Sequence, residues 1–159
     1  GRRYTKESYL ELFNKIKDTV PGVSISTDII VGFPGETEED FLETLDLVNQ
    51  CKYDNAFTFI FSKREGTKAA VMSNQLDNAV KKQRARELIE IDNVLQKDYN
   101  DDFLDTIVNV LIEENVDGKA IGHTENFLKV IIDQELESNK CYDVKIIDCD
   151  IDFVKGILI

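Results

Sequence analysis

The hydrophobic residues of this chain change their spacing near residue 104, and that change limits the folds open to it. Before it, apolar residues recur three or four apart or in short continuous runs; after it, they alternate with polar residues. The first spacing is typical of helices and buried strands, and the second of strands with one buried face. We therefore predict an α/β domain at residues 1–97 and an all-β domain at residues 98–159.

The first part alternates expected helices with expected strands. Thr5 and Thr37 are suited to cap two helices, and a long helix is expected from about residue 77. Residues 23–31 and 56–61 are rich in β-branched and aromatic residues, and the first of these runs is typical of a strand buried on both faces. The order helix, strand, helix, strand predicts a parallel sheet.

The second part contains five short runs with a period of two. They lie at about residues 107–112, 118–124, 127–132, 142–146 and 153–159, separated by turn residues. Five antiparallel strands in so short a segment suit a small closed barrel of the OB-like kind.

Charge separates the two parts as well. The chain has a net charge of −12, and residues 98–159 hold fifteen Asp and Glu against five Lys and no Arg. Neutralising nucleic-acid phosphates requires basic side chains. The second part alone is therefore not expected to bind nucleic acid by simple electrostatics.

The cysteines Cys51, Cys141 and Cys149 fit neither a disulfide framework nor a metal-binding motif. We expect a reducing, cytoplasmic environment and no metal site within these residues. No apolar run approaches the length of a membrane span, and the first residues lack a signal-peptide pattern. The chain does not begin with Met, which suggests a piece of a longer protein.

The strongest local signal for a site lies at the end of the first expected strand. Ligands of parallel α/β folds gather at the carboxyl ends of strands, where Asp28 could accept hydrogen bonds from ribose hydroxyls. Gly32 could let a flat ligand approach the backbone, although a tight turn explains residues 32–35 equally well. The second strand would end at the same rim.

Four segments together resemble one family closely. They read RRYT at residues 2–5, STDIIVGFPGETEEDF at residues 26–41, AFTFIFS at residues 56–62 and REGT at residues 64–67. The chain resembles the radical S-adenosylmethionine (SAM) methylthiotransferases of the MiaB type, which act on tRNA. The resemblance implies the C-terminal part of a parallel radical SAM (β/α) barrel, followed by a small all-β OB-like barrel, the TRAM domain.

The resemblance also implies an activity and its cofactors. The family inserts a methylthio group on an isopentenylated adenosine next to the anticodon, using SAM and two 4Fe-4S clusters. The cluster cysteines would lie upstream of Gly1, so the 159 residues alone are expected to be inactive. The implied partners are the tRNA anticodon stem-loop and the rest of the same polypeptide.

Candidate residues at the cofactor follow from the same resemblance. They are Asp28, Gly32, Phe57, Phe59 and Arg2. The charge pattern, rather than the resemblance, indicates the residues expected to face RNA. They are Lys81, Lys82, Arg84 and Arg86 on the exposed face of the long helix, with Lys129 and His123 in the barrel. The basic helix residues could instead form an ordinary solvated face.

Two departures and three alternatives remain. His123 stands where the family usually has Arg, and Phe127 also replaces a usual Arg. The chain could belong to a sister methylthiotransferase that acts on threonylcarbamoyl adenosine or on a ribosomal protein. It could also be a non-catalytic RNA-binding module.

Overall fold

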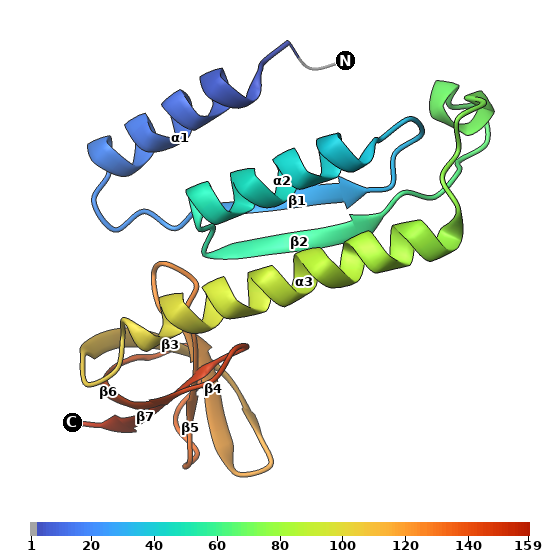
Figure 1. Ribbon diagram of the computed structural model, residues 1–159. Helices are drawn as coiled ribbons and strands as arrows, with labels where there is room; N and C mark the ends of the chain where they lie inside the picture. The colour runs from blue at the N-terminus through green and yellow to red at the C-terminus, as the bar shows by residue number, and fades with distance from the viewer. Residues whose placement is uncertain (1–2) are drawn as a thin grey trace. The chain divides into compact units, whose positions relative to one another are not determined.

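The computed structural model describes residues 3–159, which form two compact units (Figure 1). The first unit holds the chain up to Pro21 together with Ile25–Leu95, and the second holds Gly22–Ser24 and Gln96–Ile159. No helix within residues 3–159 is long and apolar enough to cross a bilayer. The two units are described separately below.

The first unit contains the helices and a two-stranded sheet. Its elements are α1 (Lys6–Thr19), β1 (Ser26–Val31), α2 (Glu38–Cys51), β2 (Asn55–Ile60), the 3₁₀ helix η1 (Lys68–Val71) and α3 (Asn78–Asp101), whose last turns belong to the second unit. Thr5 and Thr37 cap α1 and α2 as predicted, each in a reciprocal capping box with Ser8 or Asp40.

Strands β1 and β2 pair in parallel, as the helix and strand order predicts. Figure 1 shows both arrowheads pointing the same way, with α2 running back alongside them. The core lies between one face of the sheet and the three helices. It is formed by Phe13, Val31, Phe41, Val48, Cys51, Tyr53, Ala56, Ala85 and Leu88.

The opposite face of this sheet is uncovered within residues 3–159. Side chains alternate along β1 between exposed and partly buried positions, ending at the buried Val31. The prediction that β1 is buried on both faces is therefore wrong for this part of the chain. The three helices all pack on one side, and a two-stranded sheet has no other layer to cover the second side.

The second unit is a closed five-stranded barrel, as the period of two predicts. Its strands are β3 (Ile107–Val116), β4 (Lys119–His123), β5 (Lys129–Ile132), β6 (Cys141–Cys149) and β7 (Val154–Leu158). Around the barrel they follow the order β3-β4-β5-β7-β6, which suits an OB-like fold.

One strand pair of the barrel runs in parallel, so the prediction of five antiparallel strands is wrong for β5 and β7. The reason is topological. Directions can alternate all the way around a closed ring only when the number of strands is even, and this ring has five. At least one neighbouring pair must therefore be parallel, and here it is the pair that joins the third strand to the last.

Glycines allow the barrel to close tightly at two inward positions. A Cβ atom built on Gly122 would lie 2.1 Å from the carbonyl oxygen of Leu111, and one on Gly156 would lie 2.1 Å from Val144 Cγ1. Real Cβ atoms do not approach other atoms so closely. Around these glycines, branched side chains such as Ile112 and Val130 fill the interior.

We predict that Gly122→Ala destabilises the barrel by about 3 kcal/mol, because the added methyl group meets backbone atoms that cannot swing aside. Thermal or urea unfolding measures the change. Glu135→Ala, at an exposed site in the same unit, is the control and should change stability little. A Gly122→Ala protein as stable as wild type would show that the strands separate easily at this point.

A second stability prediction concerns Asp92 on α3. Burial raises the pKa of its carboxyl group from 3.8 to about 6, while a hydrogen bond from the Ala56 backbone N–H opposes that shift. The folded protein thus holds this proton more tightly than the unfolded chain does. The resulting stabilisation is present below about pH 4 and is lost as the pH rises through about 6.

We therefore predict that Asp92→Asn raises stability at pH 8 by about 1 kcal/mol, a value reduced for partial solvent screening, with little effect at pH 4. The amide imitates the neutral acid and can still accept from Ala56. Urea unfolding followed by far-ultraviolet circular dichroism at both pH values tests this, with the exposed Glu90→Gln as control. An equal effect at both pH values would contradict the assignment.

Candidate functional site

The uncovered face of the β1–β2 sheet brings together three of the residues expected at the cofactor. In the parallel register Asp28 lies opposite Phe57, and Ile30 lies opposite Phe59. Residues opposite each other share a face of the sheet. Ile30, Phe57 and Phe59 are 57%, 50% and 51% exposed, and Asp28 is exposed beside them. The result is an apolar surface with one carboxylate.

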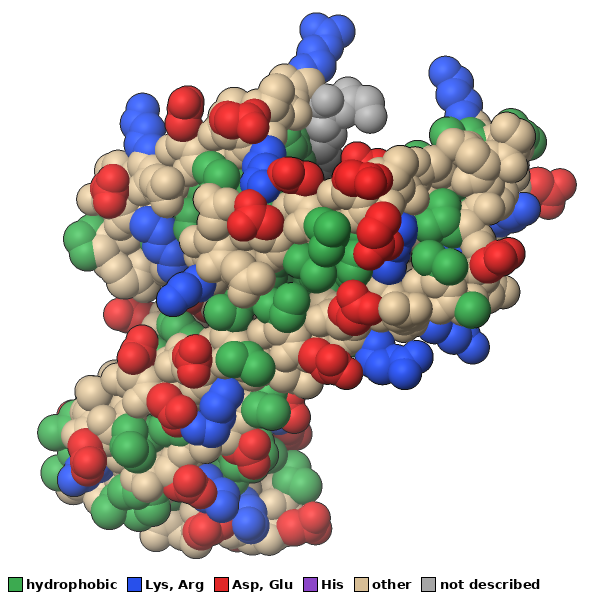
Figure 2. Space-filling model, in the orientation of Figure 1, with side chains coloured by type: hydrophobic (Ala, Val, Ile, Leu, Met, Phe, Trp, Pro, Cys, Tyr) green, Lys and Arg blue, Asp and Glu red, His purple; other side chains and the backbone are tan. Residues whose placement is uncertain are grey.

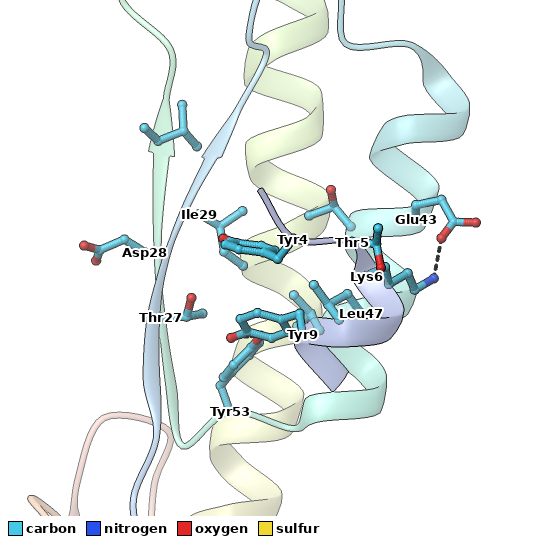
Figure 3. Close-up of a pocket in the computed structure, with 13 residues that line it drawn as sticks. Tyr4, Thr5, Lys6, Tyr9, Thr27, Asp28, Ile29, Glu43, Leu47 and Tyr53 are labelled. Carbon is cyan, nitrogen blue, oxygen red and sulfur yellow. Dashed lines mark hydrogen bonds and ion pairs between the residues drawn. The ribbon is translucent and has the colours of Figure 1, made fainter. Parts of the chain in front are cut away.

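A pocket of about 480 Å³ lies along the edge of β1 that has no strand partner within residues 3–159. It is lined by side chains of α1, β1, α2 and the residues next to the two helices, including Tyr4, Tyr9, Tyr53, Ile29 and Leu47. Figure 3 shows the three tyrosines on the helix side of β1, while Asp28 points to the other side of the strand. The pocket and the uncovered face therefore meet along β1.

Two of the phenol groups that line the pocket are hydrogen-bonded to each other. The hydroxyl of Tyr53 donates to that of Tyr9 at 2.8 Å. Burial, together with hydrogen bonds to Cys51 and Tyr9, raises the pKa of the Tyr53 phenol far above its usual range. Tyr53 is consequently neutral at any physiological pH and acts here as a hydrogen-bonding group rather than a base.

The carboxyl ends of the two strands form a rim stabilised by a tight turn. Gly32 has a φ of 75°, a conformation that favours glycine, and a Cβ there would lie 2.5 Å from Cγ of Lys81. Its N–H donates to Glu36 Oε2 at 2.9 Å. Beside the turn, the rings of Phe33 and Phe61 pack edge to face with centroids 5.3 Å apart. Packing against Lys81 thus explains this glycine without a ligand.

Two cationic side chains of α3 form hydrogen bonds with residues of that rim. Arg84 is 6% exposed; its Nη1 donates to Glu36 Oε1 at 2.5 Å, and its Nη2 donates to Glu38 Oε2 at 3.0 Å. Lys81 is 5% exposed, and its Nζ donates to the Phe61 carbonyl at 3.4 Å. The buried Arg84–Glu36 pair joins α3 to the turn that follows β1.

This finding corrects the prediction for the long helix. We expected Lys81, Lys82, Arg84 and Arg86 to share one exposed basic face, but Lys81 and Arg84 are buried in the first unit. Arg84 forms an ion pair with Glu36, and Lys81 donates a hydrogen bond to the Phe61 carbonyl. Only Lys82 and Arg86 are exposed. The cause is helical spacing: residues 81, 84, 85 and 88 form one inward stripe, and residues 82 and 86 lie outside it.

Two of the remaining expected residues belong to the second unit, and one lies outside the described residues. His123 and Lys129 are partly exposed in β4 and β5 of the barrel, and Nδ1 of His123 lies 2.9 Å from Glu113 Oε2. Arg2 lies outside the described residues. Figure 2 shows acidic side chains spread over the visible face of the barrel unit among hydrophobic ones.

The cysteines do not form a metal site. Cys51 is buried in the first unit, whereas Cys141 and Cys149 belong to the barrel. Among residues 3–159 there is no group of three or more His, Cys, Asp or Glu side chains placed to hold a metal ion. These residues therefore do not fit a 4Fe-4S cluster, which requires several thiolates around one site.

Sequence reasoning missed several residues of the site. Ile30 could have been found from its spacing of two from Asp28, which places both on one face. Glu36 could have been found as an acid placed to pair with a helix cation. The tyrosine pocket had no comparable signal, because Tyr53 is more than forty residues away in sequence from Tyr4 and Tyr9.

No family model matches the chain. Several curated proteins are similar to it, and those below carry the name tRNA-2-methylthio-N(6)-dimethylallyladenosine synthase. The protein from Alkaliphilus oremlandii is 44% identical over 94% of this chain and 32% of its own length. Those from Acetivibrio thermocellus and Clostridium tetani are 53% and 47% identical, over 71% and 92% of this chain and 24% and 33% of their own length. The matched part of the chain thus spans about a quarter to a third of the length of these relatives.

The buried ion pair gives a testable prediction for the rim. Arg84→Met should destabilise the first unit by about 3 kcal/mol, because Glu36 then remains partly buried without its cation. Arg86→Ala, two residues along the same helix and exposed, should change stability little. Unfolding by urea measures both changes.

A double variant separates the charge from the packing. If the loss in Arg84→Met arises from the stranded carboxylate, adding Glu36→Gln should recover part of it. No recovery would mean that the contact of Arg84 with the Phe41 ring, 5.2 Å away, contributes the stability instead.

Proposed function

The chain belongs to the family of the tRNA-2-methylthio-N(6)-dimethylallyladenosine synthases, and we propose that it forms the C-terminal part of such an enzyme. The complete enzyme would insert a methylthio group on an isopentenylated adenosine next to the anticodon of tRNA. The names of the relatives favour this substrate over threonylcarbamoyl adenosine or a ribosomal protein.

The uncovered face of the β1–β2 sheet is the observation that carries the proposal. A parallel sheet with helices on one side only, and with a free edge on β1, has the form of part of a (β/α) barrel seen from within. In the complete protein, upstream strands would extend the sheet, and the face bearing Asp28, Phe57 and Phe59 would line the barrel interior. Residues 1–97 would then be the C-terminal part of the radical SAM domain.

The side chains on this face suit the nucleoside part of SAM. The rings of Phe57 and Phe59 offer a flat apolar surface on which an adenine can lie. Asp28, opposite Phe57 in the register, can accept hydrogen bonds from ribose hydroxyls. When bound, SAM would supply the radical chemistry, and these residues would hold it in position. The 4Fe-4S ligands would come from the rest of the polypeptide.

The same proposal assigns residues 98–159 as a TRAM-like barrel that meets the tRNA anticodon stem-loop. Lys82 and Arg86 on α3, with His123 and Lys129 on the barrel, are the exposed or partly exposed basic residues that could contact phosphates. Lys81 and Arg84 have no part in this contact, since both are buried.

Substitution of Asp28 in the full-length enzyme tests the cofactor assignment. Asp28→Asn should weaken SAM binding by about tenfold to a hundredfold, because a charge-assisted hydrogen bond contributes about 1.5–3 kcal/mol. Isothermal titration with SAM measures the affinity, and a melting curve verifies the fold. Asp18→Asn, an exposed change on α1, is the matched control. Unchanged affinity would leave Asp28 as an ordinary surface residue of β1.

A further inference from the structure

A single phenylalanine projects from the barrel between β4 and β5. Phe127 is 82% exposed, and its φ of 62° lies in the left-handed region. That conformation is unfavourable for a bulky side chain, and an exposed ring gains nothing from burial to offset the cost. Such strain persists when the surrounding structure enforces it and is concentrated at functional sites.

The surrounding loop does enforce it. The Thr124 N–H donates to the Leu128 carbonyl at 3.1 Å, and the Phe127 N–H donates to the Thr124 carbonyl at 3.0 Å. The Leu128 N–H donates to Thr124 Oγ1 at 3.1 Å, and Asn126 Nδ2 donates to the Tyr99 hydroxyl at 2.9 Å. The turn that presents the ring is therefore anchored to the barrel and to the end of α3 within the second unit.

A second ring lies beside the first. The imidazole of His123 is 6.4 Å from the Phe127 ring, centroid to centroid, and the planes are tilted by 51°. His123 is itself oriented by Glu113, whose Oε2 lies 2.9 Å from Nδ1. The two rings form a small aromatic platform, with Lys129 two residues further along the chain.

We propose that Phe127, flanked by His123, stacks against an unpaired base of the RNA that this protein binds. The inference rests on the proposed function, from which RNA is taken as the partner. To that function it adds one specific contact, made by the Phe127 ring of the barrel. An exposed aromatic side chain can stack on any base, since each base has a π face. The platform consists of two rings only, which suits one base rather than the broad apolar surface of a stable protein interface.

Because the barrel unit is acidic, stacking on a base can contribute more to its RNA affinity than phosphate contacts can. With fifteen acidic residues against five lysines, residues 98–159 can gain little from phosphate neutralisation. Stacking requires no positive charge. Phe127 should therefore contribute affinity that hardly depends on salt, whereas a phosphate contact such as one from Lys82 should contribute to the salt dependence.

The experiment measures binding of the full-length protein to an anticodon stem-loop RNA across a salt series. A second RNA probe has the same stem but carries abasic nucleotides in its loop. Phe127→Ala should weaken binding to the intact loop by about fivefold to a hundredfold at every salt concentration, leaving the salt slope unchanged. Phe127→Trp should retain binding, and binding to the abasic loop should not respond to either change.

Two further variants separate stacking from stability and from general hydrophobic contact. Phe127→Gly should lose the same affinity while melting at the same or a higher temperature, because glycine accepts the positive φ. Ile159→Ala, at an apolar site of the same unit that is 73% exposed, should bind RNA as the wild type does.

The outcomes are distinct. If the wild type binds the stem-loop and Phe127→Ala binds it equally well, the stacking inference is wrong and the proposed function stands. If the wild type binds no stem-loop, both fail. If Phe127→Ala alters self-association instead of RNA affinity, the platform faces protein, and the inference is again overturned.

Discussion

A two-stranded parallel sheet has two faces and two edges, and the helices of this chain cover only one face. All three helices pack on the side that bears Val31 and Ala56, so Asp28 and the two phenylalanines of β2 are left on the other. The positions of Asp28, Phe57 and Phe59 depend on this one-sided packing. For α2 it follows from the right-handed crossover that normally joins two parallel strands, and α1 and α3 pack on the same apolar face as α2.

The buried cations of α3 link that packing to the rim. Arg84 spans from α3 to Glu36, and Glu36 also accepts the Gly32 N–H, so one carboxylate connects the long helix with the turn after β1. Because both groups are largely removed from water, the pair fixes a relative position of helix and turn more than it adds stability. A rim held in this way keeps the ends of β1 and β2 in a fixed position relative to α3.

Local rules predicted much of the fold. Helix caps at Thr5 and Thr37, a strand within the predicted residues 23–31 and the closed barrel were accessible because each depends on spacing or on a capping side chain nearby in sequence. Three features could not be predicted from local rules, because they depend on neighbours distant in sequence. They are the strand face that lies uncovered, the cations of α3 that turn inward and the barrel pair that is parallel. For Lys81 and Arg84, the spacing shared with Leu88 was the one local signal, and their charge obscured it.

The one-sided sheet also determines how the 159 residues should behave when produced alone. Within residues 3–159, the edge of β1 opposite β2 carries backbone donors and acceptors without strand partners, and Ile30, Phe57 and Phe59 lie on the adjoining face. Unpaired edges next to exposed apolar side chains are templates for pairing with other copies. A preparation of this segment should therefore aggregate increasingly as its concentration rises. Charged substitutions at these apolar positions should reduce the aggregation, but they would also remove the apolar surface of the uncovered face.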